Sequence, residues 1–132
     1  MKVIPDSSPQ DMTDSASATE TCEVFIYNPE AVARLRRELA DISGVTALFN
    51  LLGDPSRCTM VMALSKSREL CVCDLSEIVG LSLPTVSHHL RKLREQGLVS
   101  SRREGKLVFY RLDDESTRRL LELAEAREVV AS

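Results

Sequence analysis

The stretch Ser82-Leu83-Pro84-Thr85-Val86-Ser87-His88-His89-Leu90-Arg91-Lys92-Leu93 decides the fold. Its apolar residues Val86, Leu90 and Leu93 recur at spacings of four and three, the pattern of one buried face of an α-helix. Ser82 is a typical N-cap residue, and Gly97 is a typical residue beyond a helix end. We therefore predict an amphipathic helix that begins after Ser82 and runs to about Gln96.

A shorter helical segment precedes this helix. Residues 71–79 have helical character, and Gly80 follows them as a residue suited to a tight turn. A helix, a tight turn with glycine and a second helix form the helix-turn-helix pattern. The two runs 98–103 and 106–112 favour β-strands and are joined through Glu104-Gly105, so a β-hairpin should follow.

The rest of the chain is predicted to be helical. A first helix should begin at Asn28-Pro29 and end at Gly44, a second should cover 45–52, a third should open at Asp54-Pro55, and a last one should run from Asp114 to about Val130. The first and last helices carry more apolar surface than one small domain needs, which indicates a dimer surface. The predicted fold is mainly α with a β-hairpin wing, a dimeric winged helix-turn-helix.

Composition limits the class of protein. The chain has 132 residues, enough for one core, and only 4% aromatic residues, which favours an aliphatic helical core. Residues 1–21 are polar and should form a flexible N-terminal arm, with one domain over 22–132. We find no apolar run near the roughly 20 residues of a membrane span and no secretion signal, so we expect a cytoplasmic protein with reduced thiols.

Charge is unevenly distributed along the chain. The net charge is −3, yet residues 84–111 hold seven basic side chains and two acidic ones. A solvated charged face is the ordinary explanation of such a run, but its position in the helix-turn-helix and hairpin favours contact with DNA phosphates. The predicted DNA-binding residues are Ser82, Thr85, Ser87, His88, Arg91 and Lys92 on the helix and Arg102, Arg103 and Lys106 on the wing. For His89, a half-buried or surface role is as well supported as DNA contact.

Two cysteines, Cys71 and Cys73, lie at the start of the first helix of the helix-turn-helix. Residues i and i+2 do not share a helix face, so this pair can chelate a metal only at the first turn, where the helix dipole favours thiolates. A third ligand is needed, and Cys22 is the candidate because its setting is otherwise polar. Cys58 has apolar neighbours and is better explained by core packing. Three sulfur ligands suit Cd(II) or Pb(II), with Zn(II) and Cu(I) as further candidates.

The segment Glu69-Leu70-Cys71-Val72-Cys73-Asp74-Leu75, followed by Ser87-His88-His89-Leu90 and Glu104-Gly105-Lys106, resembles the ArsR/SmtB family of winged-helix metal-sensing repressors. Thr21-Cys22-Glu23-Val24-Phe25 resembles the arm of its cadmium- and lead-responsive, CadC-like branch. The resemblance implies a homodimer that binds operator DNA without metal and leaves it when metal joins Cys71 and Cys73 of one subunit to the arm of the other. The branch's second arm cysteine falls at Ile26, so we expect a three-sulfur site.

Three alternatives remain. An arsenite- or antimonite-responsive repressor of the same family shares Cys-Val-Cys-Asp-Leu but has a further cysteine nearby, where this chain has Ser76. A thiol redox enzyme would require C-x-x-C in a βαβ pattern, which is missing. A helical interaction module with structural zinc would leave the basic segment unused.

Overall fold

The computed structural model describes residues 20–127 and divides the chain into two compact units, residues 1–40 and residues 41–132. Residues 1–19 and 128–132 are outside the described part, and most of the predicted arm, residues 1–21, falls there. The predicted boundary between residues 21 and 22 stays a prediction. None of the helices in the described residues is both long and apolar enough to cross a membrane.

Among its described residues, 20–40, the first unit contains one helix, α1 (Pro29–Glu38), which begins where the sequence predicted. Asn28 caps it, because the Asn28 Oδ1 accepts a hydrogen bond from the Ala31 N–H at 3.0 Å. Its predicted end at Gly44 is wrong, since α1 ends at Glu38 and Gly44 lies inside α2 (Ser43–Leu52). The Asp41 carboxylate accepts a hydrogen bond from the Ser43 N–H at 3.0 Å, which satisfies a free donor at the start of α2.

Over residues 41–127, the second unit contains five helices and a small sheet. After α2 come α3 (Pro55–Ser65), α4 (Val72–Val79), α5 (Leu83–Glu95) and α6 (Glu115–Ala126). The predicted buried face of α5 is confirmed, because Val86, Leu90 and Leu93 have no exposed surface. They join a core whose other fully buried apolar residues are Met60, Val61, Leu64 and Leu75, contributed by α3 and α4. Burial of this face fixes which side of α5 points to solvent.

The turn between α4 and α5 has the geometry that the helix-turn-helix prediction requires. Gly80 adopts the left-handed conformation with φ of 71°, and its N–H donates to the Ser76 carbonyl at 2.8 Å. The Ser76 hydroxyl donates to the Leu81 carbonyl and fixes the far side of the turn. Two helices thus follow each other with only three residues between them.

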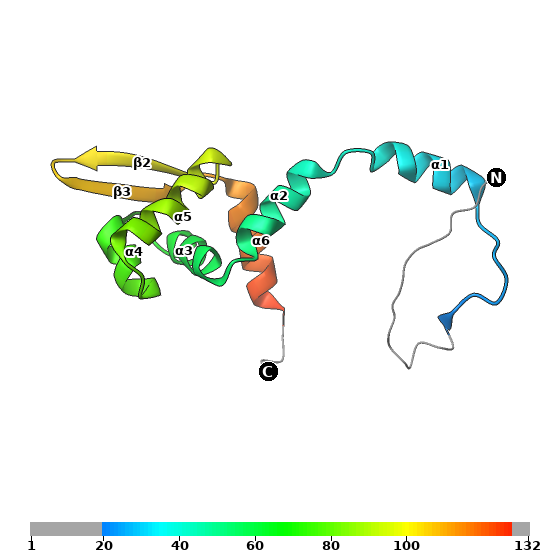
Figure 1. Ribbon diagram of the computed structural model, residues 1–132, viewed down its shortest axis with the longest axis horizontal. Coiled ribbons are helices and arrows are strands. Elements are labelled where there is room, and N and C mark those ends of the chain that lie inside the picture. The colour runs from blue at the N-terminus through cyan, green and yellow to red at the C-terminus, as the bar shows by residue number, and fades with distance from the viewer. Residues whose placement is uncertain (1–19, 128–132) are drawn as a thin grey trace. The chain divides into compact units, whose positions relative to one another are not determined.

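The predicted hairpin is confirmed and is part of a three-stranded sheet. The strands β2 (Val99–Glu104) and β3 (Leu107–Leu112) pair antiparallel, and Figure 1 shows them extending together beside α5. The sequence did not predict β1 (Leu70–Cys71), which adds to the other edge of β3 to give the order β1-β3-β2. Its pairing sets Cys71 opposite Phe109, so a thiol-bearing residue belongs to the same sheet as the wing.

Candidate functional site

The solvent-facing side of α5 carries the residues that the sequence predicted to contact DNA. The side chains of Ser82, Thr85, Ser87, His88, Arg91 and Lys92 are all exposed. At the start of the helix, the hydroxyl oxygens of Ser82 and Thr85 lie 3.0 Å apart within hydrogen-bond distance. One turn further on, Arg91 Nη1 and His88 Nδ1 are 3.4 Å apart. The arrangement offers hydroxyl and imidazole groups at the helix N-terminus and basic groups behind them.

His89 points differently from its neighbour. The residue is half-buried, and its Nδ1 has no hydrogen-bond partner among the described residues. Burial lowers the pKa of His89, and the Asp54 carboxylate partly opposes that shift. His89 therefore belongs to the edge of the core, in agreement with the half-buried alternative for this residue.

Two basic residues are unpaired at the tip of the wing. Arg103 and Lys106 are both exposed, and neither forms an ion pair within residues 20–127. Gly105 takes the left-handed conformation between the strands, with φ of 64°, and turns the chain tightly there. The two cationic side chains are thus presented to solvent at the end of the hairpin, as the prediction of a wing requires.

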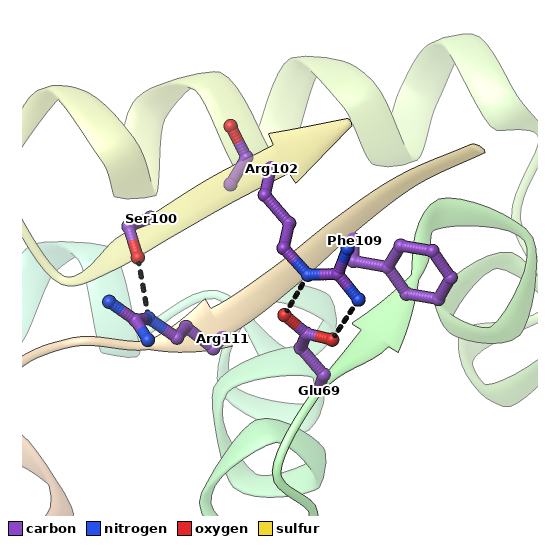
Figure 2. Close-up of a pocket in the computed structure, with 6 residues that line it drawn as sticks. Glu69, Ser100, Arg102, Phe109 and Arg111 are labelled. Atoms are coloured by element: carbon purple, nitrogen blue, oxygen red, sulfur yellow. Dashed lines mark hydrogen bonds and ion pairs between the residues drawn. The ribbon is translucent and has the colours of Figure 1, made fainter. Parts of the chain in front are cut away.

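Arg102 is held by acidic side chains instead. Its Nε donates to Glu69 Oε2 at 2.7 Å and its Nη2 donates to Glu69 Oε1 at 2.8 Å, a two-point contact (Figure 2). Its Nη1 donates to Glu104 Oε1 at 2.9 Å, and its guanidinium lies 4.7 Å from the centre of the Phe109 ring. These contacts raise the pKa of Arg102, and its hydrogen bonds lower the pKa of Glu69. The sequence did not reveal this role of Glu69, because Glu69 and Arg102 are 33 residues apart along the chain.

A shallow cavity of about 230 Å³ lies over this part of the sheet, and its lining residues are Glu69, Ser100, Ser101, Arg102, Phe109 and Arg111. Figure 2 shows Arg111 turned toward Ser100, whose hydroxyl accepts from Arg111 Nε at 3.1 Å. Arg111 was counted in the basic segment but was not predicted to be a site residue. Four of the lining residues therefore already form two bonded pairs, Glu69 with Arg102 and Ser100 with Arg111.

The two neighbouring thiols lie at the start of α4, as predicted. Cys71 is the N-cap residue in an extended conformation, and its N–H donates to Asp74 Oδ2 at 3.0 Å. Cys73 is the second residue of the helix and is exposed, whereas Cys71 is half-buried. Because Cys71 lies before the first helical residue, the rule that separates i and i+2 within a helix does not apply to this pair.

The other two cysteines differ in setting. Cys22 is exposed and belongs to the first unit, and Cys58 is half-buried on α3, less enclosed than a core residue. Within residues 20–127, no three His, Cys, Asp or Glu side chains are gathered closely enough to hold a metal ion. The second unit thus provides two adjacent sulfur donors. Sulfur is the ligand type that a thiophilic ion prefers, but two donors are fewer than such a site needs.

Comparisons with known proteins show which family the chain belongs to. A family model described as bacterial regulatory protein, arsR family, matches residues 54–101. The chain is 41% identical over 107 residues to the cadmium resistance transcriptional regulatory protein CadC homolog of Staphylococcus aureus, a match over 80% of this chain and 88% of that protein. The chain belongs to the ArsR family. This family membership shows a DNA-binding helix-turn-helix regulator rather than an enzyme, which removes the thiol redox and zinc-module alternatives.

Two more similarities concern a second repressor and a solved structure. The arsenical resistance operon repressor of Escherichia coli is 49% identical over 65 residues, covering 49% of this chain and 56% of that protein. The homodimeric winged helix-turn-helix DNA-binding domain from Mycobacterium bovis superimposes with a TM-score of 0.60 at 30% identity, covering 67% of this chain and 82% of that domain. The winged helix-turn-helix prediction is thus confirmed for this ArsR-family chain.

Proposed function

We propose that this ArsR-family chain is a repressor that binds operator DNA as a metal-free homodimer and is released by a thiophilic ion. The inducing ion is Cd(II) or Pb(II), with Zn(II) as a further candidate, held by the thiolates of Cys22, Cys71 and Cys73. The single observation that carries this proposal is the pair of thiols at the N-terminus of α4, the helix that packs directly against α5. The similarity to a cadmium resistance regulator supports it.

The DNA half of the proposal rests on α5 and the wing tip. The N-terminal end of α5 enters the major groove, where the hydroxyls of Ser82, Thr85 and Ser87 and the imidazole of His88 approach base edges. Arg91 and Lys92 bind phosphates on either side of that groove, and Arg103 and Lys106 bind phosphates from the wing. The exposure of all these side chains supports the assignment.

The homodimer rests on apolar side chains that remain exposed. On α2, Val45 and Phe49 expose 55% and 56% of their surface, and on α6 Leu123 exposes 70%. Exposed apolar groups of this size on a small unit mark a surface that another protein covers. A second copy of the chain is the partner we propose, supported by the homodimeric relative.

The metal half needs a third sulfur donor beside Cys71 and Cys73. Cys22 supplies it, and as the family resemblance implies it comes from the partner's arm. Bound metal would supply a bridge between the arm and the start of α4. The chain then transmits the change through two contacts of the thiol-bearing segment, one from α4 to α5 and one from β1 to β3. DNA affinity falls by the same factor by which DNA weakens metal binding, because the coupling of two sites is reciprocal.

The test is a titration of the full chain with Cd(II), Pb(II) and Zn(II), read by ultraviolet thiolate absorption and by anisotropy of labelled operator DNA. We expect Cys22→Ser, Cys71→Ser and Cys73→Ser each to abolish metal-driven release while metal-free DNA affinity stays at the wild-type value. Cys58→Ser is the matched control and should release like wild type. Release of the Cys71→Ser variant at wild-type metal concentrations would refute the proposal.

The runner-up inducer is arsenite or antimonite. It is favoured by the 49% identity to the arsenical resistance operon repressor. Against it stands Ser76, which occupies the place of a further thiol and whose hydroxyl holds the turn before α5. Arsenite should therefore leave the operator complex intact in the same anisotropy assay, and release at micromolar arsenite would favour this second function.

A further inference from the structure

We propose that the ion pair between Glu69 and Arg102 couples the thiol site to the wing, so that both are positioning residues for metal-driven release. This inference rests on the proposed function and adds a route to it. Arg102 then acts through Glu69 on the placement of the wing, rather than as one more phosphate contact.

The first argument is the physical connection between the thiol site and the wing. Glu69 directly precedes β1, and β1 consists of Leu70 and Cys71 before α4 begins. The backbone of Cys71 pairs with Phe109, and Phe109 pairs across the hairpin with Arg102. The Arg102 side chain returns over the Phe109 ring to bind both carboxylate oxygens of Glu69. Residues 69–71 are thus joined to the hairpin at two points, by backbone pairing with β3 and by the ion pair with Arg102 of β2 (Figure 2).

The second argument is that Arg102 has few donors left for DNA. Two of its nitrogen atoms donate to Glu69 and the third donates to Glu104. Two carboxylates around one guanidinium offset its positive charge, which weakens its attraction for a phosphate. A phosphate would also have to displace a two-point contact whose geometry is among the most favourable for arginine. Arg103 and Lys106 carry no such partners among the described residues and are free for that role.

The third argument concerns what a displacement of Cys71 would do. A two-point arginine–carboxylate contact tolerates little change in distance or angle. Glu69 is two residues from Cys71, so any shift of β1 toward a ligand on the sulfur carries Glu69 with it. The wing must then follow Glu69, or the ion pair must break. Either outcome changes where Arg103 and Lys106 lie relative to α5.

The experiment compares wild type, Glu69→Gln, Arg102→Gln, Arg102→Lys and the Glu69→Gln/Arg102→Gln double variant. The measured quantity is the ratio of operator Kd with saturating Cd(II) to operator Kd without metal. We expect each Gln variant to lower this ratio about fivefold or more, within the range of coupling between sites. The double variant should fall no further than either single one, and Arg102→Lys should lie between. Thiolate absorption should match wild type throughout.

The matched control is Glu125→Gln, which breaks the exposed ion pair between Glu125 on α6 and Lys66 at the end of α3, whose Nζ and Oε1 atoms lie 3.0 Å apart. It should leave the ratio unchanged. A wild-type chain that binds Cd(II), Pb(II) and Zn(II) but keeps its DNA with each of them refutes the proposed function itself, whatever the variants do.

Two outcomes overturn the coupling role while leaving the proposed function standing. In the first outcome, Arg102→Gln weakens metal-free DNA binding, lowers the slope of log Kd against log salt by about 0.9, and keeps the wild-type ratio of Kd with and without Cd(II). Arg102 is then a phosphate contact. In that case Glu69→Gln should strengthen DNA binding by freeing the guanidinium. If all five proteins share one Kd and one ratio, the pair is an exposed ion pair without functional effect.

Discussion

Gly80 offers a test of the turn on which the orientation of α5 depends. Its φ of 71° is strained for any residue with a side chain, whereas an added Cβ would meet no heavy atom within 4 Å. The cost of Gly80→Ala is therefore that of the left-handed backbone alone, roughly 1–2 kcal/mol. For a unit of this size, that loss lowers Tm by roughly 4–16 °C.

Urea denaturation followed by circular dichroism measures the effect directly. Gly80→Asn should lose less stability, because asparagine tolerates the left-handed region better than alanine. Gly44→Ala is the matched control, since Gly44 lies in α2 with no atom within 4 Å of an added Cβ. It should keep the wild-type stability or gain about 0.4–1 kcal/mol. Equal stability of Gly80→Ala and wild type would refute the reasoning, as would equal losses at the two glycines.

Three other predictions follow from burial and charge. Leu90→Ala removes a fully buried side chain of α5 and should lower the free energy of unfolding by about 2–5 kcal/mol in urea titrations. Because burial lowers the pKa of His89 in the folded chain, stability should fall as the pH drops below the ordinary histidine value of about 6.5 and level off below the folded-state pKa. His89→Gln should flatten that part of the pH profile, and an unchanged profile would contradict the assignment. Lys106→Ala should lower the slope of log Kd against log salt by about 0.9, whereas an unchanged slope would remove Lys106 from the DNA surface.

The elements that could be predicted are those whose signals are local. For α5, the cap Ser82, the apolar spacing and the terminal Gly97 all lie within one segment, and the structure has the helix and its buried face as expected. The hairpin likewise depends on two β-favouring runs around Gly105. The position of Cys71 and Cys73 at a helix start followed from the same short-range pattern.

The features that escaped prediction depend on contacts elsewhere. The apolar stripe of α1 continues through Leu39 to Ile42, and only the hydrogen bond from Ser43 to the Asp41 side chain shows where a new helix begins. A two-residue strand such as β1 has no pattern of its own, because it forms only against β3. The partner of Arg102 was hidden for the same reason, since no local rule connects it with Glu69 across 33 residues.

The chain has no tryptophan and two tyrosines, one in each compact unit. Tyr110 is buried in β3 opposite Leu70, whereas Tyr27 precedes α1 and exposes 37% of its surface. Near-ultraviolet spectra of this chain therefore have a low aromatic background, against which sulfur-to-metal charge-transfer bands stand out. Tyr27→Phe would leave Tyr110 as the single tyrosine, and its emission would report on the environment of the sheet alone.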